Sequence, residues 1–335
     1  MPRVAVLDDY QGVALQMADW SVLAPDCRVQ VFRDHLTHLD ALADRLRDFE
    51  VVTCMRERTP FRRDLLKRLP NLRLLVTTGM RNAAIDVVAA TELGVLVCGT
   101  ASGPESPPAE LTWGLILALV RHIPREDAAT RLGHWGTTVG MSLENRVLGV
   151  LGLGRLGAAV ARVGVAFQMS VIAWSQNLPA ERAAQCGATL VTKDELFARS
   201  DILTIHVQLS ERTRGLVGAR ELALMKRTAY LINTARGAIV DERALIHALQ
   251  ARAIAGAGLD VFDQEPLPPD HPFKRLDNTL LMPHAGYVTE EQYRVRYRDT
   301  VEDIAAYLRG APLRVLNPKA RETSGTRPPQ RKNVA

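Results

Sequence analysis

The sequence predicts an α/β protein of two domains, each with a parallel β-sheet covered by helices. The first observation is length, because 335 residues are too many for one ordinary hydrophobic core. The second is the alternation of short apolar runs with segments of helical periodicity, which is typical of successive β-α-β units. The third is a glycine-rich turn at residues 152–157, which joins an apolar run to a helical pattern.

The first hundred residues predict one small α/β domain. Its strands are expected at 4–7, 51–55, 72–76 and 95–98. Between them, residues 38–49 carry apolar side chains along one stripe, and residues 61–69 are a second helix candidate. Strands that are separated by single helices predict a parallel sheet.

Residues 99–108 are rich in Gly, Ser and Pro and predict a linker. Ser106 is a candidate helix cap, and Pro107 can start a helix that continues over 109–122. This helix is apolar around nearly its whole circumference, so we expect it to be buried. The glycine-containing segment 131–144 predicts an irregular arm for self-association.

The second half of the chain contains more continuous apolar runs. They predict strands at 147–151, 171–174, 202–207, 229–232, 257–259 and 280–282. Such runs suit a parallel sheet that is covered on both faces. A last helix is expected over 290–308, and its place after the final strand suggests that the chain returns to the first domain.

The formal net charge of +5 is concentrated near the C-terminus. Between residues 311 and 335 the basic side chains are opposed by Glu322 alone, so the rest of the chain is nearly neutral. This distribution makes nucleic acid an unlikely partner. We expect residues 318–335 to form a disordered basic tail, with polyanion binding as the alternative reading of that tail.

No apolar run reaches the roughly 18 residues that a membrane helix needs. A strand pattern begins almost at Met1, which leaves no room for a signal peptide. We therefore expect a cytoplasmic protein without a membrane partner. The four cysteines, Cys27, Cys54, Cys98 and Cys186, are widely spaced and predict reduced, buried thiols and no metal site.

The glycine-rich turn has the spacing G-x-G-x-x-G, formed by Gly152, Gly154 and Gly157. In a dinucleotide-binding turn the first glycine allows the bend, the second leaves room for a pyrophosphate, and the third lets the helix pack on the sheet. Such turns also occur purely as packing elements. Because a second strand follows at 171–174, at the spacing of a Rossmann domain, we expect a dinucleotide site.

Three chemically active side chains follow the ends of later strands: Arg236, Glu265 and His284. The carboxyl ends of parallel strands lie along one edge of a sheet, where open α/β sheets bind ligands. Each residue also has a structural explanation, as a surface ion pair, an exposed loop acid or a core histidine. Their occurrence at the same edge favours a catalytic set.

Five stretches together resemble the D-isomer-specific 2-hydroxyacid dehydrogenase family: 152–157, 201–206, 233–237, 258–267 and 283–286. The resemblance implies a central Rossmann dinucleotide-binding domain, residues 100–286, inserted in a discontinuous flavodoxin-like substrate domain, residues 1–99 plus 287–317. It also implies a homodimer formed mainly through the cofactor domain.

The resemblance implies catalytic roles for the three strand-end residues. Arg236 would hold the carboxylate of a 2-oxo acid and polarise its ketone oxygen with a planar fork of donors. His284 would be the acid in reduction and the base in oxidation. Glu265 would orient the imidazole and favour its charged form. In the formate dehydrogenase branch an amide usually replaces this acid, so Glu265 argues against that branch.

NAD is the expected cofactor. The residues expected to bind it are Gly152, Gly154, Arg155, Leu156, Gly157, Ser175, Gln176, His206, Thr234, Ala235 and Asp260. NADP is kept as an alternative because Ser175 stands where NAD-dependent relatives usually carry an acid for the ribose hydroxyls. The expected substrate-binding residues are Arg56, Gly79, Met80, Arg81 and Tyr287.

Two of these substrate residues depart from the family's usual pattern. Relatives usually have glycine at the position of Arg81 and a small residue at that of Tyr287. If Arg81 faces the substrate, it favours a second anionic group there; the alternative is that Arg81 turns outward or pairs with Asp86.

The sequence thus predicts an NAD(P)-dependent oxidoreductase that interconverts a small 2-oxo acid and its D-2-hydroxy acid. The rival prediction is a nucleotide-sensing interaction protein, since the carboxy-terminal-binding-protein corepressors resemble the same family.

Overall fold

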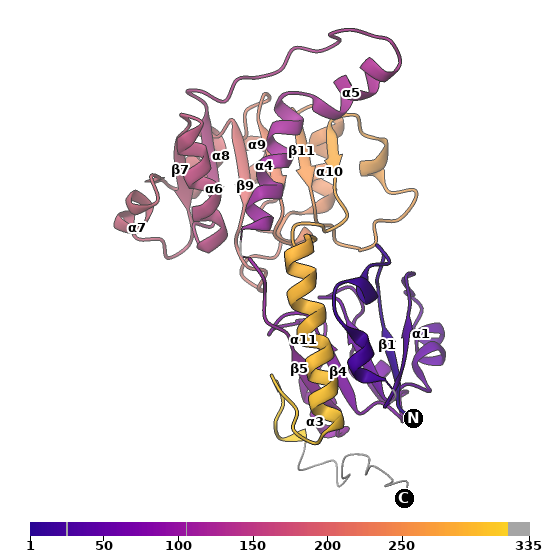
Figure 1. The fold of residues 1–335 in the computed structure, drawn as a ribbon. Helices are drawn as coiled ribbons and strands as arrows, with labels where there is room; N and C mark the ends of the chain where they lie inside the picture. The colour runs from indigo at the N-terminus through magenta and orange to yellow at the C-terminus, as the bar shows by residue number, and fades with distance from the viewer. Residues whose placement is uncertain (25, 105, 321–335) are drawn as a thin grey trace, which may run out of the picture. The chain divides into compact units, whose positions relative to one another are not determined.

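The computed structural model describes residues 1–320 apart from Pro25 and Glu105, so the expected tail beyond Ala320 lies outside the described residues. The chain divides into two compact units (Figure 1). Unit 1 consists of Met1–Pro104 and the segment that begins at Val288, and unit 2 of Glu105–Tyr287.

Unit 1 contains a five-stranded sheet of order β2-β1-β3-β4-β5, in which all neighbours are parallel. The strands are β1 (Arg3–Val6), β2 (Arg28–Val31), β3 (Val51–Cys54), β4 (Leu74–Thr77) and β5 (Leu96–Gly99). This strand order is the flavodoxin-like one, as expected. Strands β3, β4 and β5 are buried along their whole length, which their apolar sequences require.

The helices of unit 1 are α1 (Leu39–Leu46), α2 (Arg63–Leu66), α3 (Val87–Glu92) and α11 (Glu290–Leu308), with short 3-10 turns η1 (Ala14–Gln16) and η2 (Trp20–Leu23). Helix α11 begins where the Thr289 side chain accepts a hydrogen bond from the Gln292 N–H. It packs against β4 and η2, so the C-terminal segment completes the core of the first sheet (Figure 1).

Unit 2 contains a seven-stranded parallel sheet of order β12-β11-β10-β9-β6-β7-β8. The strands are β6 (Val147–Leu151), β7 (Ser170–Trp174), β8 (Thr189–Leu190), β9 (Ile202–Ile205), β10 (Tyr230–Asn233), β11 (Gly256–Leu259) and β12 (Thr279–Leu281). The strand order reverses between β6 and β9, which is the topological switch point of a Rossmann fold. The expected fold class is confirmed.

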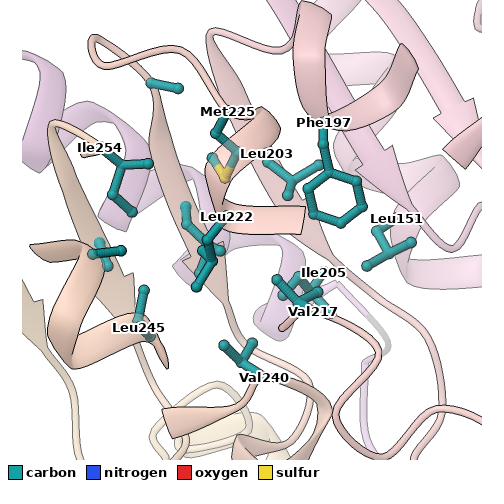
Figure 2. Close-up of a cluster of buried hydrophobic side chains, with 14 of the residues drawn as sticks. Leu151, Phe197, Leu203, Ile205, Val217, Leu222, Met225, Val240, Leu245 and Ile254 are labelled. Carbon is teal, nitrogen blue, oxygen red and sulfur yellow. The ribbon is translucent and has the colours of Figure 1, made fainter. Parts of the chain in front are cut away.

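Helices cover both faces of this sheet. The helices of unit 2 are α4 (Pro107–Val120), α5 (Ile123–Arg131), α6 (Arg155–Ala166), α7 (Ala180–Gln185), α8 (Lys193–Arg199), α9 (Ala219–Leu224) and α10 (Glu242–Gln250), with 3-10 turns η3 (Gly237–Ile239) and η4 (Pro272–Arg275); α5 buries no residue. On one face, Phe197, Leu222 and Leu245 of the helices belong to the same buried cluster as Leu203 and Ile205 of β9 (Figure 2). Alternate strand residues point to the other face, where α4 and α6 form a second cluster.

Several local predictions were wrong. Strand β2 was missed because its sequence, Arg-Val-Gln-Val, is half polar and only half-buried at the sheet edge. Helix α5 was missed because none of its residues is buried, so it has no apolar periodicity. The helix expected over 61–69 is shorter, because Phe61 forms a β-bridge with Ile85 before α2 begins.

The helix cap and the start of the tail also differ from expectation. Ser106 makes no side-chain capping bond, because its own backbone is already helical with φ −71° and ψ −31°, although Pro107 is the first residue of α4 as predicted. The tail was expected from residue 318, but Ala320 is buried at 1% exposure and its N–H donates to the Asn317 carbonyl at 3.0 Å. Among the described helices, none is both long and apolar enough to cross a bilayer.

Candidate active site

The glycine-rich turn links β6 to α6 with the geometry that each glycine predicts. Gly152 has φ +100°, and an added Cβ would lie 2.7 Å from the Val207 backbone nitrogen. A Cβ on Gly157 would lie 2.0 Å from the Gly152 carbonyl oxygen, so only glycine lets α6 approach the strand this closely. A Cβ on Gly154 would meet no described atom within 4 Å. The backbone at Gly154, the N-cap of α6, is therefore open to a phosphate group, which accepts hydrogen bonds from helix N-termini.

Ser175 follows β7 and contacts the glycine-rich turn. Its Oγ accepts a hydrogen bond from the Leu153 N–H at 3.3 Å. Gln176 and Asn177, the next two residues, are exposed. Positions 175–177 thus present hydroxyl and amide groups but no carboxylate, as the sequence requires.

The ends of β9 and β10 carry polar groups with defined partners. His206 Nε2 lies 2.9 Å from Thr204 Oγ1, and burial lowers the pKa of His206 to about 4, which keeps its ring neutral. Thr234 Oγ1 lies 2.9 Å from Thr112 Oγ1 of α4, a contact that sequence spacing could not indicate. Asn233 accepts a hydrogen bond from the Ala235 N–H at 3.0 Å, which shapes the turn after β10.

Arg236 lies in that same turn, directly before η3. The Asn233 side-chain amide donates to the Arg236 carbonyl at 3.0 Å, and Arg236 Nη1 donates to the Ala235 carbonyl at 2.7 Å. A Cβ on Gly237 would lie 2.1 Å from the carbonyl carbon of Phe262. The turn that carries Arg236 therefore packs directly on the backbone of the loop that carries Glu265.

Glu265 and His284 form a hydrogen-bonded pair, with Glu265 Oε2 at 2.6 Å from His284 Nδ1. The other carboxylate oxygen, Oε1, accepts a hydrogen bond from the Phe262 N–H at 2.9 Å. Since an ionised carboxylate can only accept, the proton of this pair is on Nδ1. No other described residue hydrogen-bonds to the ring, so Nε2 is the atom that can exchange a proton with a ligand.

The segment around His284 is held by Asp260, at the end of β11. The Asp260 carboxylate accepts hydrogen bonds from the Ala285 and Gly286 N–H groups at 2.7 and 2.9 Å. Burial raises the pKa of Asp260 to about 6, although these two bonds oppose the shift. The Tyr287 ring lies edge-on to the His284 ring at 5.6 Å between centroids, and Tyr287 is buried.

The other four predicted substrate residues belong to unit 1, where they lie next to one another. Gly79 has φ +94°, and an added Cβ would lie 2.4 Å from Arg56 Nη1, so the Arg56 guanidinium covers the Gly79 backbone. Met80 and Arg81 are exposed. Asp86 does not pair with Arg81: it caps α3 and lies 3.9 Å from Arg63 Nε.

The described residues contain no group of three or more His, Cys, Asp or Glu side chains that could hold a metal ion. All four cysteines are buried with free thiols, as predicted. The groups that face an open turn at α6 are backbone N–H groups, which fit the phosphates of a dinucleotide.

Comparison with known proteins agrees with this geometry. Residues 113–286 match the model of the D-isomer specific 2-hydroxyacid dehydrogenase, NAD binding domain. A glyoxylate reductase of Aeropyrum pernix is 40% identical over 256 residues, which are 74% of this chain and 76% of that protein. A D-3-phosphoglycerate dehydrogenase of Methanocaldococcus jannaschii is 38% identical over 81% of this chain, but the chain spans only 52% of that relative.

A crystal structure of a phosphoglycerate oxidoreductase from Vibrio cholerae O395 superposes with a TM-score of 0.87 at 35% identity, covering 93% of this chain and 100% of that one. The match therefore extends over both units, beyond the part of unit 2 that the family model covers. The chain belongs to the D-isomer-specific 2-hydroxyacid dehydrogenase family and is an NAD-dependent oxidoreductase of this type.

Proposed function

We propose that the enzyme reduces a small 2-oxo acid to its D-2-hydroxy acid, or catalyses the reverse reaction, with Arg236, Glu265 and His284 as its catalytic residues. The observation that carries the proposal is the pair of Glu265 and His284. The carboxylate accepts a hydrogen bond from Nδ1–H, so Nε2 is available to the substrate. Bound NADH supplies the hydride. Substrate binding, proton transfer and orientation of the imidazole are performed by side chains of this chain.

Arg236 binds the substrate carboxylate and polarises the ketone oxygen, because its planar guanidinium can donate to two oxygens at once. His284 gives the Nε2 proton to that oxygen as it becomes a hydroxyl, and takes it back in the oxidation. Glu265 fixes the ring orientation and stabilises the imidazolium. The names of the relatives, glyoxylate reductase and D-3-phosphoglycerate dehydrogenase, support 2-oxo acids with short chains as the substrate class.

The proposed NAD-binding residues lie along the carboxyl edge of the second sheet and at the start of α6. They are Gly152, Gly154, Arg155, Leu156, Gly157, Ser175, Gln176, His206, Thr234, Ala235 and Asp260. Since positions 175–177 carry neither an acid nor a cation, discrimination against NADPH should be weak. We expect NADH to be modestly preferred, because the extra phosphate of NADPH would be desolvated there without a firm partner.

The test is to measure oxidation of NADH and of NADPH with glyoxylate, pyruvate, hydroxypyruvate, oxaloacetate, 2-oxoglutarate and phosphohydroxypyruvate. Turnover of at least one of these 2-oxo acids, with chiral analysis that shows the D product, supports the proposal. A preference for one coenzyme above about a hundredfold, roughly 2.7 kcal/mol, contradicts the assignment of positions 175–177. NADH binding without turnover of any acid contradicts the proposed reaction.

We further propose that the enzyme is a homodimer formed through unit 2. The irregular arm after α5 exposes large apolar side chains, with 77% of Leu132, 90% of Trp135 and 93% of Val139 accessible. In the mostly apolar helix α4, Gly114 is exposed, and an added Cβ there would meet no described atom within 4 Å. Exposed apolar segments of this kind are typical of interfaces.

Light scattering after size-exclusion chromatography tests the dimer. Wild-type protein should have the mass of two chains, whereas Trp135→Ala combined with Val139→Asp should reduce it towards one. A monomeric wild-type protein contradicts this part of the proposal.

A further inference from the structure

Unit 2 contains a second histidine–glutamate pair, formed by Glu242 and His271, that sequence reasoning did not single out. Glu242 is the first residue of α10, and His271 directly precedes η4. His271 Nε2 lies 3.1 Å from Glu242 Oε1. The side chains are mostly buried, with 12% of His271 and 22% of Glu242 exposed.

The direction of each hydrogen bond in this pair is fixed by its neighbours. The Phe273 N–H donates to His271 Nδ1 at 3.3 Å, so the ring proton is on Nε2 and is donated to Glu242. The second oxygen, Glu242 Oε2, accepts from the Asp263 N–H at 3.3 Å. Both oxygens of Glu242 therefore act as acceptors, which a carboxylate can do and a side-chain amide cannot.

These bonds join the two ends of one loop to α10. Asp263 lies at the start of the loop and His271 near its end, and Glu265 lies between them. Beneath the loop, the Phe273 side chain is buried, and its ring lies 4.9 Å from the His271 ring. Glu265 in turn accepts a hydrogen bond from the Phe262 N–H, next to Asp263. The position of the Glu265 carboxylate thus depends on a loop that Glu242 holds at both ends.

We propose that Glu242 and His271 are positioning residues that keep Glu265 in hydrogen-bonding distance of His284. This inference rests on the proposed function, in which Glu265 orients the catalytic histidine. Burial and the carboxylates of Glu242 and Asp241 raise the pKa of Asp263, whereas Arg214 and His271 oppose the shift. Glu242 thus lies beside like charges while it accepts hydrogen bonds from both ends of the loop.

The experiment compares Glu242→Gln, His271→Ala and the double variant. The two donors to Glu242 are the Asp263 N–H and His271 Nε2–H. Glutamine has the shape of glutamate but only one oxygen, so one of these donors would face an amide N–H and the loop would lose one hydrogen bond. We expect kcat to fall about ten- to a hundredfold, because small misplacements of catalytic groups have effects of this size. KM for the 2-oxo acid and Kd for NADH, the latter from fluorescence titration, should change less than twofold. The double variant should lose no more than the worse single one, since both act through one loop.

A spectroscopic signature separates positioning from general stability. A proton in a short N–H···O⁻ bond is strongly deshielded, so the Nδ1–H of His284 should give a low-field proton resonance in the wild type. We expect Glu242→Gln and His271→Ala to weaken or shift this resonance. Asp194→Asn is the matched control: it breaks a carboxylate–arginine pair of the same unit, with Arg220, that does not touch the loop. It should leave both kcat and the resonance unchanged.

Glu265→Gln distinguishes failure of this inference from failure of the proposed function. If Glu265→Gln loses turnover and the resonance while Glu242→Gln and His271→Ala retain both, the positioning role is wrong and the proposed function stands. If Glu265→Gln itself keeps wild-type turnover, the proposed role of Glu265 is wrong and the inference falls with it. A lower Tm with unchanged kcat and resonance in His271→Ala also overturns the inference, and this variant decides the case if Glu242→Gln does not fold.

Discussion

The carboxyl-terminal edges of the two sheets each carry a histidine–carboxylate pair, but the pairs are built differently. In unit 1, His35 Nδ1 lies 2.9 Å from Asp8 Oδ1, and the side chains are 9% and 2% exposed. In unit 2, the side chains of His284 and Glu265 are 19% and 31% exposed. The residue types and the bond are similar in both places. In each pair the second carboxylate oxygen also accepts one hydrogen bond, from Thr59 in unit 1 and from the Phe262 N–H in unit 2. The difference lies in how far the pair is exposed.

Asp8 is hydrogen-bonded to residues that follow β3. Thr59 Oγ1 donates to Asp8 Oδ2 at 2.6 Å, and Arg58 Nη1 donates to the Asp8 carbonyl at 2.6 Å. These contacts connect the segments that follow β1 and β3, so we expect the pair in unit 1 to stabilise the fold. The comparison teaches that exposure, more than residue type, distinguishes a pair that a ligand can reach from one that is enclosed by the fold.

The largest expected effect comes from His284→Ala. Turnover should fall by about 10²- to 10⁴-fold, the usual contribution of a general acid–base group. NADH binding should be nearly unchanged, because the turn that we propose to bind the phosphates is a separate segment, Gly152–Gly157. The measurements are steady-state kcat and NADH fluorescence titration. A folded variant with wild-type turnover would remove the distinction between the two pairs, as would an equal loss of turnover in His35→Ala.

Arg81→Ala tests whether the edge of unit 1 contributes to substrate choice. If Arg81 contacts the substrate, the variant should lose about ten- to a hundredfold in kcat/KM on acids with a second anionic group, since a charge-assisted bond contributes about 1.5–3 kcal/mol. Oxaloacetate, 2-oxoglutarate and phosphohydroxypyruvate should be affected, and pyruvate and glyoxylate should not. An equal loss on both sets means that Arg81 supports the loop and does not select the substrate.

Asp8→Ala should affect stability and leave catalysis unchanged. The substitution leaves the buried hydroxyl of Thr59 and the ring of His35 without an acceptor, at a cost of about 1–3 kcal/mol in the free energy of unfolding. Urea denaturation measures this loss, and kcat and KM should stay within twofold of the wild type. A large loss of turnover in a stable Asp8→Ala protein would show that the pair in unit 1 is functional after all.

His206 provides a third case, a strand-end histidine with no carboxylate partner among the described residues. Burial lowers its pKa from the ordinary 6.5 to about 4, so between these values the unfolded chain binds a proton that the native protein does not. Stability of the cofactor-free enzyme should therefore fall as pH falls from 6.5 towards 4, by at most about 1.4 kcal/mol per pH unit. The slope should be smaller than this limit because part of His206 is exposed.

Urea denaturation at several pH values, in wild type and His206→Gln, measures this contribution. The wild type should lose more stability over this interval than the variant. Identical pH dependence in the two proteins would mean that His206 is protonated normally in the native state.

Much of the fold could be predicted because its apolar runs are continuous. Six strands of the second sheet, the glycine-rich turn and α11 follow from periodicity and glycine spacing that local sequence determines, whereas β8, only two residues long, was not predicted. Strand β2 and helix α5 could not be predicted, because the one is half polar and the other buries nothing. Strand β2 is fixed by its pairing with β1, whereas α5 contacts mainly α4, the helix that precedes it.

The candidate site likewise has residues that the sequence predicted and residues that it did not. The strand ends predicted the common edge of Arg236, Glu265 and His284, since parallel strands end together. The pair of Glu242 and His271 could not be predicted from strand ends, because its residues lie 29 positions apart and neither directly follows a strand. Likewise, Asp86 was a candidate partner for Arg81 in sequence, but helix α3 uses it as a cap.

The close approach at Gly237 has a consequence for protein engineering. Because a single added carbon would lie 2.1 Å from the Phe262 carbonyl carbon, the segments that carry Arg236 and Glu265 are fitted to each other backbone to backbone. Exchanging one of them for the equivalent segment of a relative, in order to change specificity, breaks this fit if the new segment places a side chain at position 237. Residues 233–238 and 260–266 therefore form one module for loop grafting or library design, and variation in either should be sampled jointly.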